Sequence, residues 1–308
     1  MASGSQPAVA SSDDTDLPGS MGDALSIRCW GTRGSIPSPG PSTAGFGGNT
    51  PCLEVTAGGR TVIFDAGTGI RLLGEKLQET EGSVRTTIFL THFHWDHIQG
   101  FPFFAPLYDP GADLTIFGPE QGDLDIRTLF AGQMGPIYFP IPFEAVGARV
   151  DFRPMNEEEW AEDGVGVRSL RVRHPSFTVG YRLEAPGGTL CYVPDNELGG
   201  GEYPLADGWR ERFLAFLEGA DVLFHDAMLT EEEYPSRTGW GHSTFGQTVD
   251  LAGEAGVDRL FFFHHAPERS DVELDGIVER FRKDVDRRGL DLEVGAAFEG
   301  EDIRIEGG

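Results

Sequence analysis

Lysine is almost absent from this chain of 308 residues, in which only Lys76 and Lys283 occur. Aspartate and glutamate total 50 against 24 lysines and arginines, so the formal net charge is −26. A strongly acidic surface repels nucleic-acid phosphates and anionic membranes at long range. The charge therefore argues against RNA and membranes as partners and favours a small substrate. A saline habitat or the genome's composition explains the same bias equally well.

Cysteine is also scarce, and Cys29, Cys52 and Cys191 form no Cys-x-x-Cys pair. We expect three small buried hydrophobic residues in a reducing compartment, with neither disulfides nor a zinc knuckle. No apolar run approaches the roughly 20 residues that cross a bilayer. The N-terminus also lacks the basic and apolar segments of a secretory signal. These absences predict a cytoplasmic protein without a membrane span.

Residues 1–24 are rich in Ser, Gly, Ala and Asp without apolar periodicity, which predicts a disordered tail before a single domain at 25–308. Strand-like runs are expected at 26–31, 52–57, 61–66, 86–91, 114–118, 149–153, 167–172, 179–184, 189–193, 221–225, 259–263, 292–297 and 302–305. Helices are expected at 70–79, 208–218 and 245–255, and a last one from the capping box Ser270/Glu273 to Gly289. This order suits an α/β fold of two packed sheets with helices outside.

All eight histidines fall in five places, each of which follows or closes a hydrophobic strand. The densest place is the run His92-Phe93-His94-Trp95-Asp96-His97. Alternate residues share a face of an extended segment, so His92 and His94 point to the same side. Imidazole and carboxylate ligands suit zinc, manganese or iron, and a pair of such cations can activate water and hold a phosphoryl or acyl oxygen. The run therefore predicts a metal-dependent hydrolase.

The run resembles the His-x-His-x-Asp-His signature of the metallo-β-lactamase superfamily, and the resemblance extends from about residue 26 to the C-terminus. The chain most resembles the branch of this superfamily that contains ribonuclease Z and the phosphodiesterases related to phosphoribosyl cyclic phosphate phosphodiesterase. The resemblance implies a four-layer αββα sandwich and a site for two divalent metal ions, zinc foremost, with manganese or iron as alternatives.

The resemblance also assigns residues to the metal site. His174 matches an isolated ligand, Asp195 the bridging carboxylate, and His264 is selected over His265 because it lies three residues before Pro267. One metal would take His92, His94, His174 and Asp195; the other would take Asp96, His97, Asp195 and His264. Asp65, in a strand followed by a Gly-rich turn, would orient a metal-bound histidine, although it also fits a helix-capping aspartate.

Two further motifs resemble the phosphodiesterase branch. His225-Asp226-Ala227 is similar to the His-Glu-Ala-Thr motif of ribonuclease Z, and Gly241-His242-Ser243-Thr244 matches its Gly-His-Ser-Thr motif. The resemblance implies that His242 donates to the scissile phosphate or its leaving oxygen and that Asp226 holds it. Catalytic roles are thus expected for His242, Asp226 and Asp96. A plain helix start at His242 and an added role for His225 stay open.

Three weaker features border the expected site. Arg33, in a Gly-rich loop, is a candidate phosphate contact, and His265 either faces substrate or packs. Tyr138 or Phe139, in an aromatic stretch, is a candidate for stacking on a base. No long basic arm of the kind that ribonuclease Z uses to grip tRNA is visible, and a homodimer is possible.

The favoured hypothesis is a two-metal phosphodiesterase acting on a small, cyclic phosphodiester. The alternatives are a lactone, ester or thioester hydrolase of the same fold, a tRNA 3′-processing endonuclease, and a non-catalytic binding module. The His242 and Asp226 motifs disfavour the ester hydrolase, the acidic charge disfavours tRNA, and the complete set of ligands disfavours the binding module.

Overall fold

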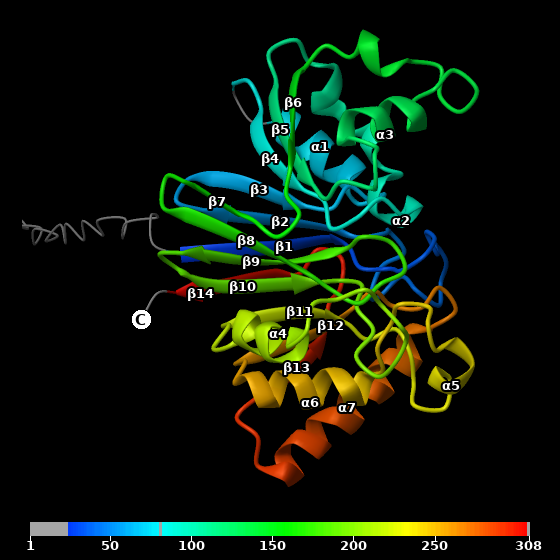
Figure 1. Cartoon of the computed structure of the whole chain (residues 1–308), viewed down its shortest axis with the longest axis vertical. Coiled ribbons are helices and arrows are strands. Elements are labelled where there is room, and N and C mark those ends of the chain that lie inside the picture. Colours follow the sequence, from blue (N-terminus) through cyan, green and yellow to red (C-terminus); the bar gives the residue numbers. More distant parts are fainter. Residues whose placement is uncertain (1–23, 80–81, 307–308) are drawn as a thin grey trace, which may run out of the picture.

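Two seven-stranded sheets lie face to face in the computed structural model, which describes residues 24–79 and 82–306 (Figure 1). The disordered tail predicted at 1–24 lies outside these residues, apart from Ala24, where the first strand begins. The first sheet has the order β14 (Asp302–Glu306), β1 (Ala24–Gly31), β2 (Cys52–Ala57), β3 (Arg60–Phe64), β4 (Arg85–Phe89), β5 (Asp113–Gly118) and β6 (Arg149–Pro154). The second has the order β13 (Glu293–Ala296), β12 (Arg259–Phe263), β11 (Val222–Asp226), β10 (Gly188–Val193), β9 (Val179–Ala185), β8 (Val165–Arg171) and β7 (Glu159–Glu162).

Helices cover the outer face of each sheet. The helices of the described residues are α1 (Ile70–Gln78), α2 (Trp95–Ile98), α3 (Ile126–Gln133), α4 (Trp209–Leu217), α5 (Tyr234–Arg237), α6 (Phe245–Ala255) and α7 (Asp271–Arg288), with 3-10 helices η1 (Phe101–Phe103), η2 (Ala105–Tyr108) and η3 (Phe143–Ala145); the four-residue helices α2 and α5 lie at the end of the sheets and not on an outer face. Helices α1 and α3 pack on the first sheet, whereas α4, α6 and α7 pack on the second. The predicted αββα sandwich is therefore confirmed.

The core between the sheets is built from the inward residues of strands in both. Phe64 of β3 lies with its ring centroid 5.5 Å from Tyr181 and 5.6 Å from Tyr192, so aromatic rings interlock across the interface. All three are completely buried. Rings of this size bury a large apolar area and favour tilted contacts, which stabilises the packing of one sheet on the other.

Parallel pairing in both sheets brings the strand ends that carry chemistry to one edge. In the first sheet Phe64 pairs with Phe89, so β3 and β4 end side by side before Asp65 and His92. In the second, β10, β11 and β12 are parallel neighbours, and they lead into Asp195, Asp226 and His264. The carboxyl ends of parallel strands are the usual place for a site in such a sheet.

Local signals explain most of the elements. Helix α7 begins at the predicted capping box, with Ser270 as N-cap and Glu273 closing it, and ends at Gly289 in the left-handed conformation. Helix α3, which Asp125 caps, and the four-residue strand β7 are present in the fold but were not predicted from the sequence. Cys29, Cys52 and Cys191 are buried and free, as expected. Among residues 24–79 and 82–306, no helix combines the length and apolarity required to cross a membrane.

Candidate metal centre and active site

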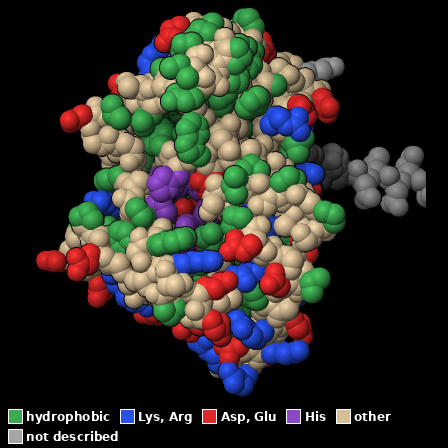
Figure 2. Space-filling view, turned by 90° about the vertical axis from the view of Figure 1, so that its right-hand side faces the viewer, with side chains coloured by type: hydrophobic (Ala, Val, Ile, Leu, Met, Phe, Trp, Pro, Cys, Tyr) green, Lys and Arg blue, Asp and Glu red, His purple; other side chains and the backbone are tan. Residues whose placement is uncertain are grey.

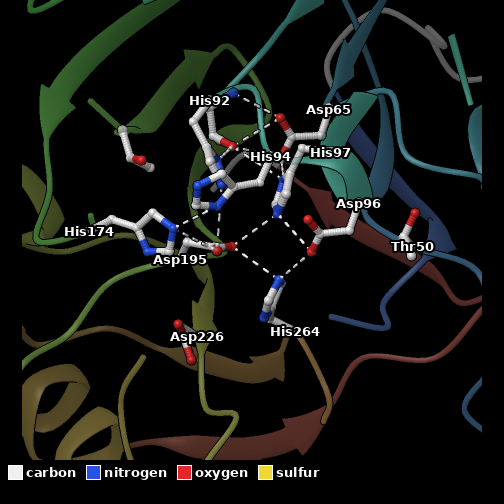
Figure 3. Close-up of polar contacts among 12 residues, drawn as sticks. Thr50, Asp65, His92, His94, Asp96, His97, His174, Asp195, Asp226 and His264 are labelled. Carbon is white, nitrogen blue, oxygen red and sulfur yellow. Dashed lines mark hydrogen bonds and ion pairs between the residues drawn. The ribbon is translucent and has the colours of Figure 1, made fainter. Parts of the chain in front are cut away.

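Side chains that could hold metal ions meet where the two sheets end (Figure 3). The first group consists of His92, His94, His174 and Asp195, and the second consists of Asp96, His97 and His264. A third possible group combines His242 with Asp195 and His264, which it shares with the first two. Within each group the donor atoms lie within 4.8 Å of one another. Asp195 Oδ1 lies 3.1 Å from His97 Nε2 and 3.2 Å from His264 Nε2 in the second group. The structure thus brings all seven predicted ligands together, with Asp195 between the groups.

Several of these buried atoms have no hydrogen-bond partner in the described residues. They include His92 Nε2, His97 Nε2 and Asp195 Oδ1. Leaving a buried donor or acceptor unsatisfied costs about 1–3 kcal/mol each, so a folded protein rarely gathers several at one point. The nitrogen and oxygen donor set fits divalent zinc, manganese or iron. The residues present therefore fit two metal ions.

Hydrogen bonds behind the cluster aim the histidine nitrogens at its centre. His97 Nδ1 donates to Asp65 Oδ2 at 2.8 Å, which leaves Nε2 with the lone pair that binds a metal. His174 Nδ1 donates to the carbonyl of Gly241 at 3.1 Å with the same consequence. Asp65 also accepts from Thr91 N–H at 2.8 Å and Tyr192 O–H at 3.0 Å. Its carboxylate is held from several sides, and the helix-capping alternative for Asp65 is not observed.

The charges at the centre are arranged for a cation. Burial disfavours the charged form of His97, but Asp195, Asp96 and Asp65 surround the ring and raise its pKa well above the ordinary value. Burial also opposes ionisation of Asp195, yet the neighbouring histidines, His264 first, hold its pKa well below the usual range. The carboxylates that stabilise a proton on His97 would also stabilise the positive charge of a metal ion bound between these groups.

Asp96 lies at the start of α2 and faces the second group. Its Oδ2 atom accepts from the backbone N–H of Ser35 at 2.7 Å and lies 3.0 Å from His264 Nε2. His264 and Asp65 have positive φ angles, 60° and 59°. Such a backbone costs non-glycine residues of order 1 kcal/mol or more and gathers at functional sites. The strain lies at two residues that directly follow parallel strands.

His242 and Asp226 form a buried pair beside the metal ligands. His242 Nδ1 donates to Asp226 Oδ2 at 2.8 Å, and the imidazole ring stacks on His264 with centroids 5.0 Å apart. Burial lowers the pKa of His242, but Asp226, Asp195 and Asp96 outweigh it and raise the pKa to about 9. His242 also lines the pocket over the metal centre, whereas Asp226 does not. Its protonated ring can therefore donate to a molecule in the pocket.

Glu197 is a functional residue to which the sequence analysis assigns no role. Its carboxylate is completely buried and accepts from the hydroxyls of Tyr203 and Tyr234 and from the backbone N–H groups of Gly239 and Gly241. These bonds fix the turn that carries His242 and presents the Gly241 carbonyl to His174. The only signal in the sequence is an acidic residue two positions after Asp195.

Three predicted site residues serve the scaffold instead. The Arg33 guanidinium is fully buried and donates to the carbonyls of Gly47, Ala266 and Arg269, so its predicted phosphate contact is wrong. His265 donates from Nε2 to the Ala297 carbonyl, which is the packing alternative.

His225 is buried behind Asp226. Its Nδ1 atom donates to the Asp226 carbonyl and its Nε2 atom accepts from the Asn196 amide. His225 does not line the pocket, so any role it has is to support Asn196 and Asp226.

The metal ligands form the floor of an open pocket of about 410 Å³. It is lined by Ser35, Phe93, His94, Trp95, Asp96, Asp195, His242 and His264. Figure 2 shows the histidines in a hollow of the surface, with hydrophobic side chains gathered along its border (Figure 2). Pockets of a few hundred Å³ hold small ligands. A small molecule in this hollow would touch the metal ligands and His242 together.

Comparisons with known proteins agree with this geometry. Residues 60–265 match the family described as "Beta-lactamase superfamily domain". A ribonuclease Z of Picrophilus torridus is 25% identical over 293 residues, which cover 82% of this chain and 90% of that protein. The metallo-beta-lactamase fold protein YhfI from Bacillus subtilis is 18% identical, with TM-score 0.65 and coverage of 92% and 99%. A diphosphatase from the PhnP family is 21% identical, with TM-score 0.62 and coverage of 91% and 97%. This chain belongs to the β-lactamase superfamily and has the metallo-β-lactamase fold.

Proposed function

We propose that this chain is a two-metal phosphodiesterase that hydrolyses a small phosphodiester, with cyclic phosphodiesters as the favoured class. The observation that carries the proposal is the His242–Asp226 pair, which stands beside the metal ligands and lines the same pocket. Hydrolysis of a phosphodiester needs positive charge near the non-bridging oxygens and a proton for the departing alkoxide. Cations held by the ligand cluster would supply the first requirement, and His242 supplies the second.

His92, His94, His174 and Asp195 would hold one cation, and Asp96, His97, Asp195 and His264 the other. Two bound cations supply activation of water and neutralisation of the phosphate charge. Asp226 orients His242 through Nδ1, so Nε2 is the nitrogen that protonates the leaving oxygen. Asp65 and the Gly241 carbonyl keep two ligand histidines in the metal-binding tautomer. Trp95 and Phe93 line the same pocket beside these groups.

A small substrate is favoured over an RNA. No lysine or arginine is among the described residues that line the pocket, and the whole chain carries a net charge of −26. Proteins that bind nucleic acids depend on basic contacts with phosphates, and here these are missing from the site itself.

Precursor tRNA is the second candidate substrate. Relatives such as the Picrophilus torridus protein are named ribonuclease Z and match most of the chain. The homodimer expected from the resemblance stays a prediction, as does the choice of zinc over manganese or iron.

A substrate panel tests the proposal. Wild-type protein loaded with zinc, manganese or iron is assayed on 2′,3′-cyclic and 3′,5′-cyclic nucleotides, bis(p-nitrophenyl) phosphate, a lactone, a thioester and a precursor tRNA. We expect turnover of the small phosphodiesters and its loss in His242→Ala. Hydrolysis of the lactone or thioester alone would overturn the phosphodiesterase assignment. If precursor tRNA is cleaved with a higher kcat/KM than any small phosphodiester, the assignment of a small substrate is overturned.

A further inference from the structure

Trp95 stands between two predicted metal ligands, His94 and Asp96, and lines the pocket over the metal centre. Its side chain is 60% exposed, although an indole gains free energy when it is buried. Pockets that bind small molecules are lined mainly by hydrophobic and aromatic side chains, with a few polar groups placed among them. The position of Trp95 therefore calls for a functional explanation.

The other four tryptophans have partners within the fold. Trp30 donates to Glu54, Trp160 contacts Phe89, Trp209 stacks on Phe213, and Trp240 lies under the guanidinium of Arg237. Trp95 has no ring contact, cation–π contact or side-chain hydrogen bond with any residue in the described part of the chain. It also belongs to none of the hydrophobic clusters. Packing therefore does not explain this indole.

The second aromatic residue of the pocket, Phe93, is different. It is half-buried, packs against the outer core of the first sheet and makes an edge contact with Phe130 at 6.0 Å. Packing explains Phe93 without a ligand. Of the two aromatic walls, only Trp95 is free to accept a ring from solution.

The candidates for base stacking that the sequence suggested lie elsewhere. Phe139 makes an edge contact with Phe103, with centroids 5.4 Å apart. Tyr138 is 73% exposed, but it is not among the residues that line the pocket. Neither ring reaches the metal centre in the way that Trp95 does.

The chemistry of the pocket indicates what Trp95 binds. No lysine or arginine is among the described residues that line the pocket, and its histidines lie at the metal centre, so the part of the substrate away from the metals is not recognised through its charge. A flat aromatic group stacks on an indole without needing charge, and stacking a base on an aromatic side chain contributes substantially to binding. A sugar phosphate without a base would leave the indole in water.

We propose that Trp95 is the stacking platform for a nucleobase, so the substrate is a nucleotide-type phosphodiester and not a base-free sugar phosphate. This inference rests on the proposed phosphodiesterase function. The phosphate lies over the metal ligands with the leaving oxygen toward His242, while the base covers the Trp95 indole at the rim of the pocket. Trp95 sets which phosphodiester binds, and the ligands and His242 break the bond.

Two substrates with the same reactive group separate these roles. Adenosine 2′,3′-cyclic phosphate and glycerol 1,2-cyclic phosphate both contain a five-membered cyclic phosphodiester, but only the first has a base. The ring opening of each compound is monitored by ³¹P NMR at matched concentrations of metal-loaded protein. We expect wild-type protein to have a kcat/KM at least about tenfold higher for the adenosine compound, in keeping with the strength of base stacking.

Substitutions at Trp95 then test the source of this preference. Trp95→Ala should lower kcat/KM for the adenosine compound about tenfold or more, mainly through KM, and leave the glycerol compound within about twofold. Trp95→Phe should retain most of the preference because it keeps an aromatic face, whereas Trp95→Leu should lose it. Tyr138→Ala removes an exposed ring outside the pocket and should change neither substrate.

The outcomes separate the two proposals. If wild-type protein opens neither ring, and no other phosphodiester, the proposed function fails. If it opens both with similar kcat/KM, or if Trp95→Ala slows both equally, the function stands and the assignment of Trp95 to a base is overturned. A loss in Tyr138→Ala equal to that in Trp95→Ala would also overturn it, because the effect would then not come from the pocket.

Discussion

Asp226 accepts a hydrogen bond from Nδ1 of His242 at 2.8 Å, and the same carboxylate is held by the backbone N–H groups of Asn196 and Met228. Asp226 is completely buried at the end of β11, so it cannot turn toward solvent. The pair fixes the tautomer of His242 and leaves Nε2 as the nitrogen available to a substrate. A buried carboxylate that orients a catalytic imidazole is a recurring arrangement in hydrolases.

Asp226→Asn should lower kcat for phosphodiester hydrolysis about 100-fold or more, because an amide no longer stabilises the required tautomer and charge of His242. KM and metal content should change little, since Asp226 does not line the pocket and is itself a member of none of the possible metal-binding groups. Steady-state kinetics and metal analysis on the same preparations check this. In the double variant with His242→Ala, the loss should equal that of His242→Ala alone. Additive losses would contradict the pairing.

Asp65→Asn should weaken metal binding about 10- to 100-fold, the range found when the partner of a ligand histidine is removed. The Asp65 carboxylate accepts hydrogen bonds from His97, Thr91 and Tyr192. An asparagine side chain would place its NH₂ group, which is itself a donor, against some of these donors. Competition with a chelator of known affinity measures the change. Asp163→Asn, which alters an exposed ion pair with Arg60, is the control and should bind metal normally. Unchanged affinity in Asp65→Asn would refute its orienting role.

Glu197→Gln should reduce kcat about tenfold or more and destabilise the fold by about 1–3 kcal/mol, because it leaves buried donors without a full acceptor. The affected donors include the backbone N–H groups of Gly239 and Gly241, which set the position of His242. Tyr203→Phe removes one of the hydroxyl donors and keeps the backbone bonds, so kcat should stay within about threefold. Chemical denaturation and kinetics together test this. Equal kcat in Glu197→Gln and wild-type would show that the turn is positioned without this carboxylate.

Glu301 makes stability depend on pH. Burial raises the pKa of Glu301 to about 7, although the Phe298 N–H and Arg259 oppose this. In the unfolded chain the pKa of this carboxyl is about 4.3. The folded chain therefore holds the proton more tightly than the unfolded chain does. As a result, the free energy of unfolding falls as pH rises from about 4.3 to about 7.

Glu301→Gln removes this titration. The variant should be about 1–2 kcal/mol more stable than wild-type at pH 8, after allowance for solvent at a partly exposed group. The difference should shrink toward zero at pH 4.5, where the carboxyl is neutral in the folded protein. Urea unfolding at both pH values measures it. A constant difference would show that Glu301 has the same pKa in the folded and the unfolded chain.

The side chains that meet at the candidate metal centre were predictable because their chemistry is concentrated in a short run and repeated at strand ends. His92, His94, Asp96 and His97 lie within six positions, and parallel pairing brings distant His174, Asp195 and His264 to the same edge. The fold followed for a similar reason, since most strands and the larger helices show clear periodicity and caps. Strand β7 was missed because its four residues are too few to show an alternating pattern, and α3 was missed because its eight residues make only about two turns.

The failures share one physical cause, which is that a polar residue in a loop does not reveal its partner. Arg33 belongs to a loop that was expected to border the site, yet its guanidinium donates to three backbone carbonyls from other segments of the chain. Glu197 has four hydrogen-bond donors around it, two of which are backbone groups of a turn some 40 residues further along the chain. The role of Trp95 depends on its exposure, and the fold shows that this indole is 60% exposed and belongs to none of the hydrophobic clusters of the described residues.

The most direct test of the account is a titration of metal-free protein with zinc, manganese or iron, with metal content and turnover of a cyclic phosphodiester measured on the same sample. The account predicts that turnover reaches its maximum at two metal ions per chain. In His264→Ala, which removes a ligand of the second group only, the protein should retain one ion and lose most of its turnover. Full turnover at one ion per chain, or turnover by metal-free protein, would contradict a two-metal phosphodiesterase.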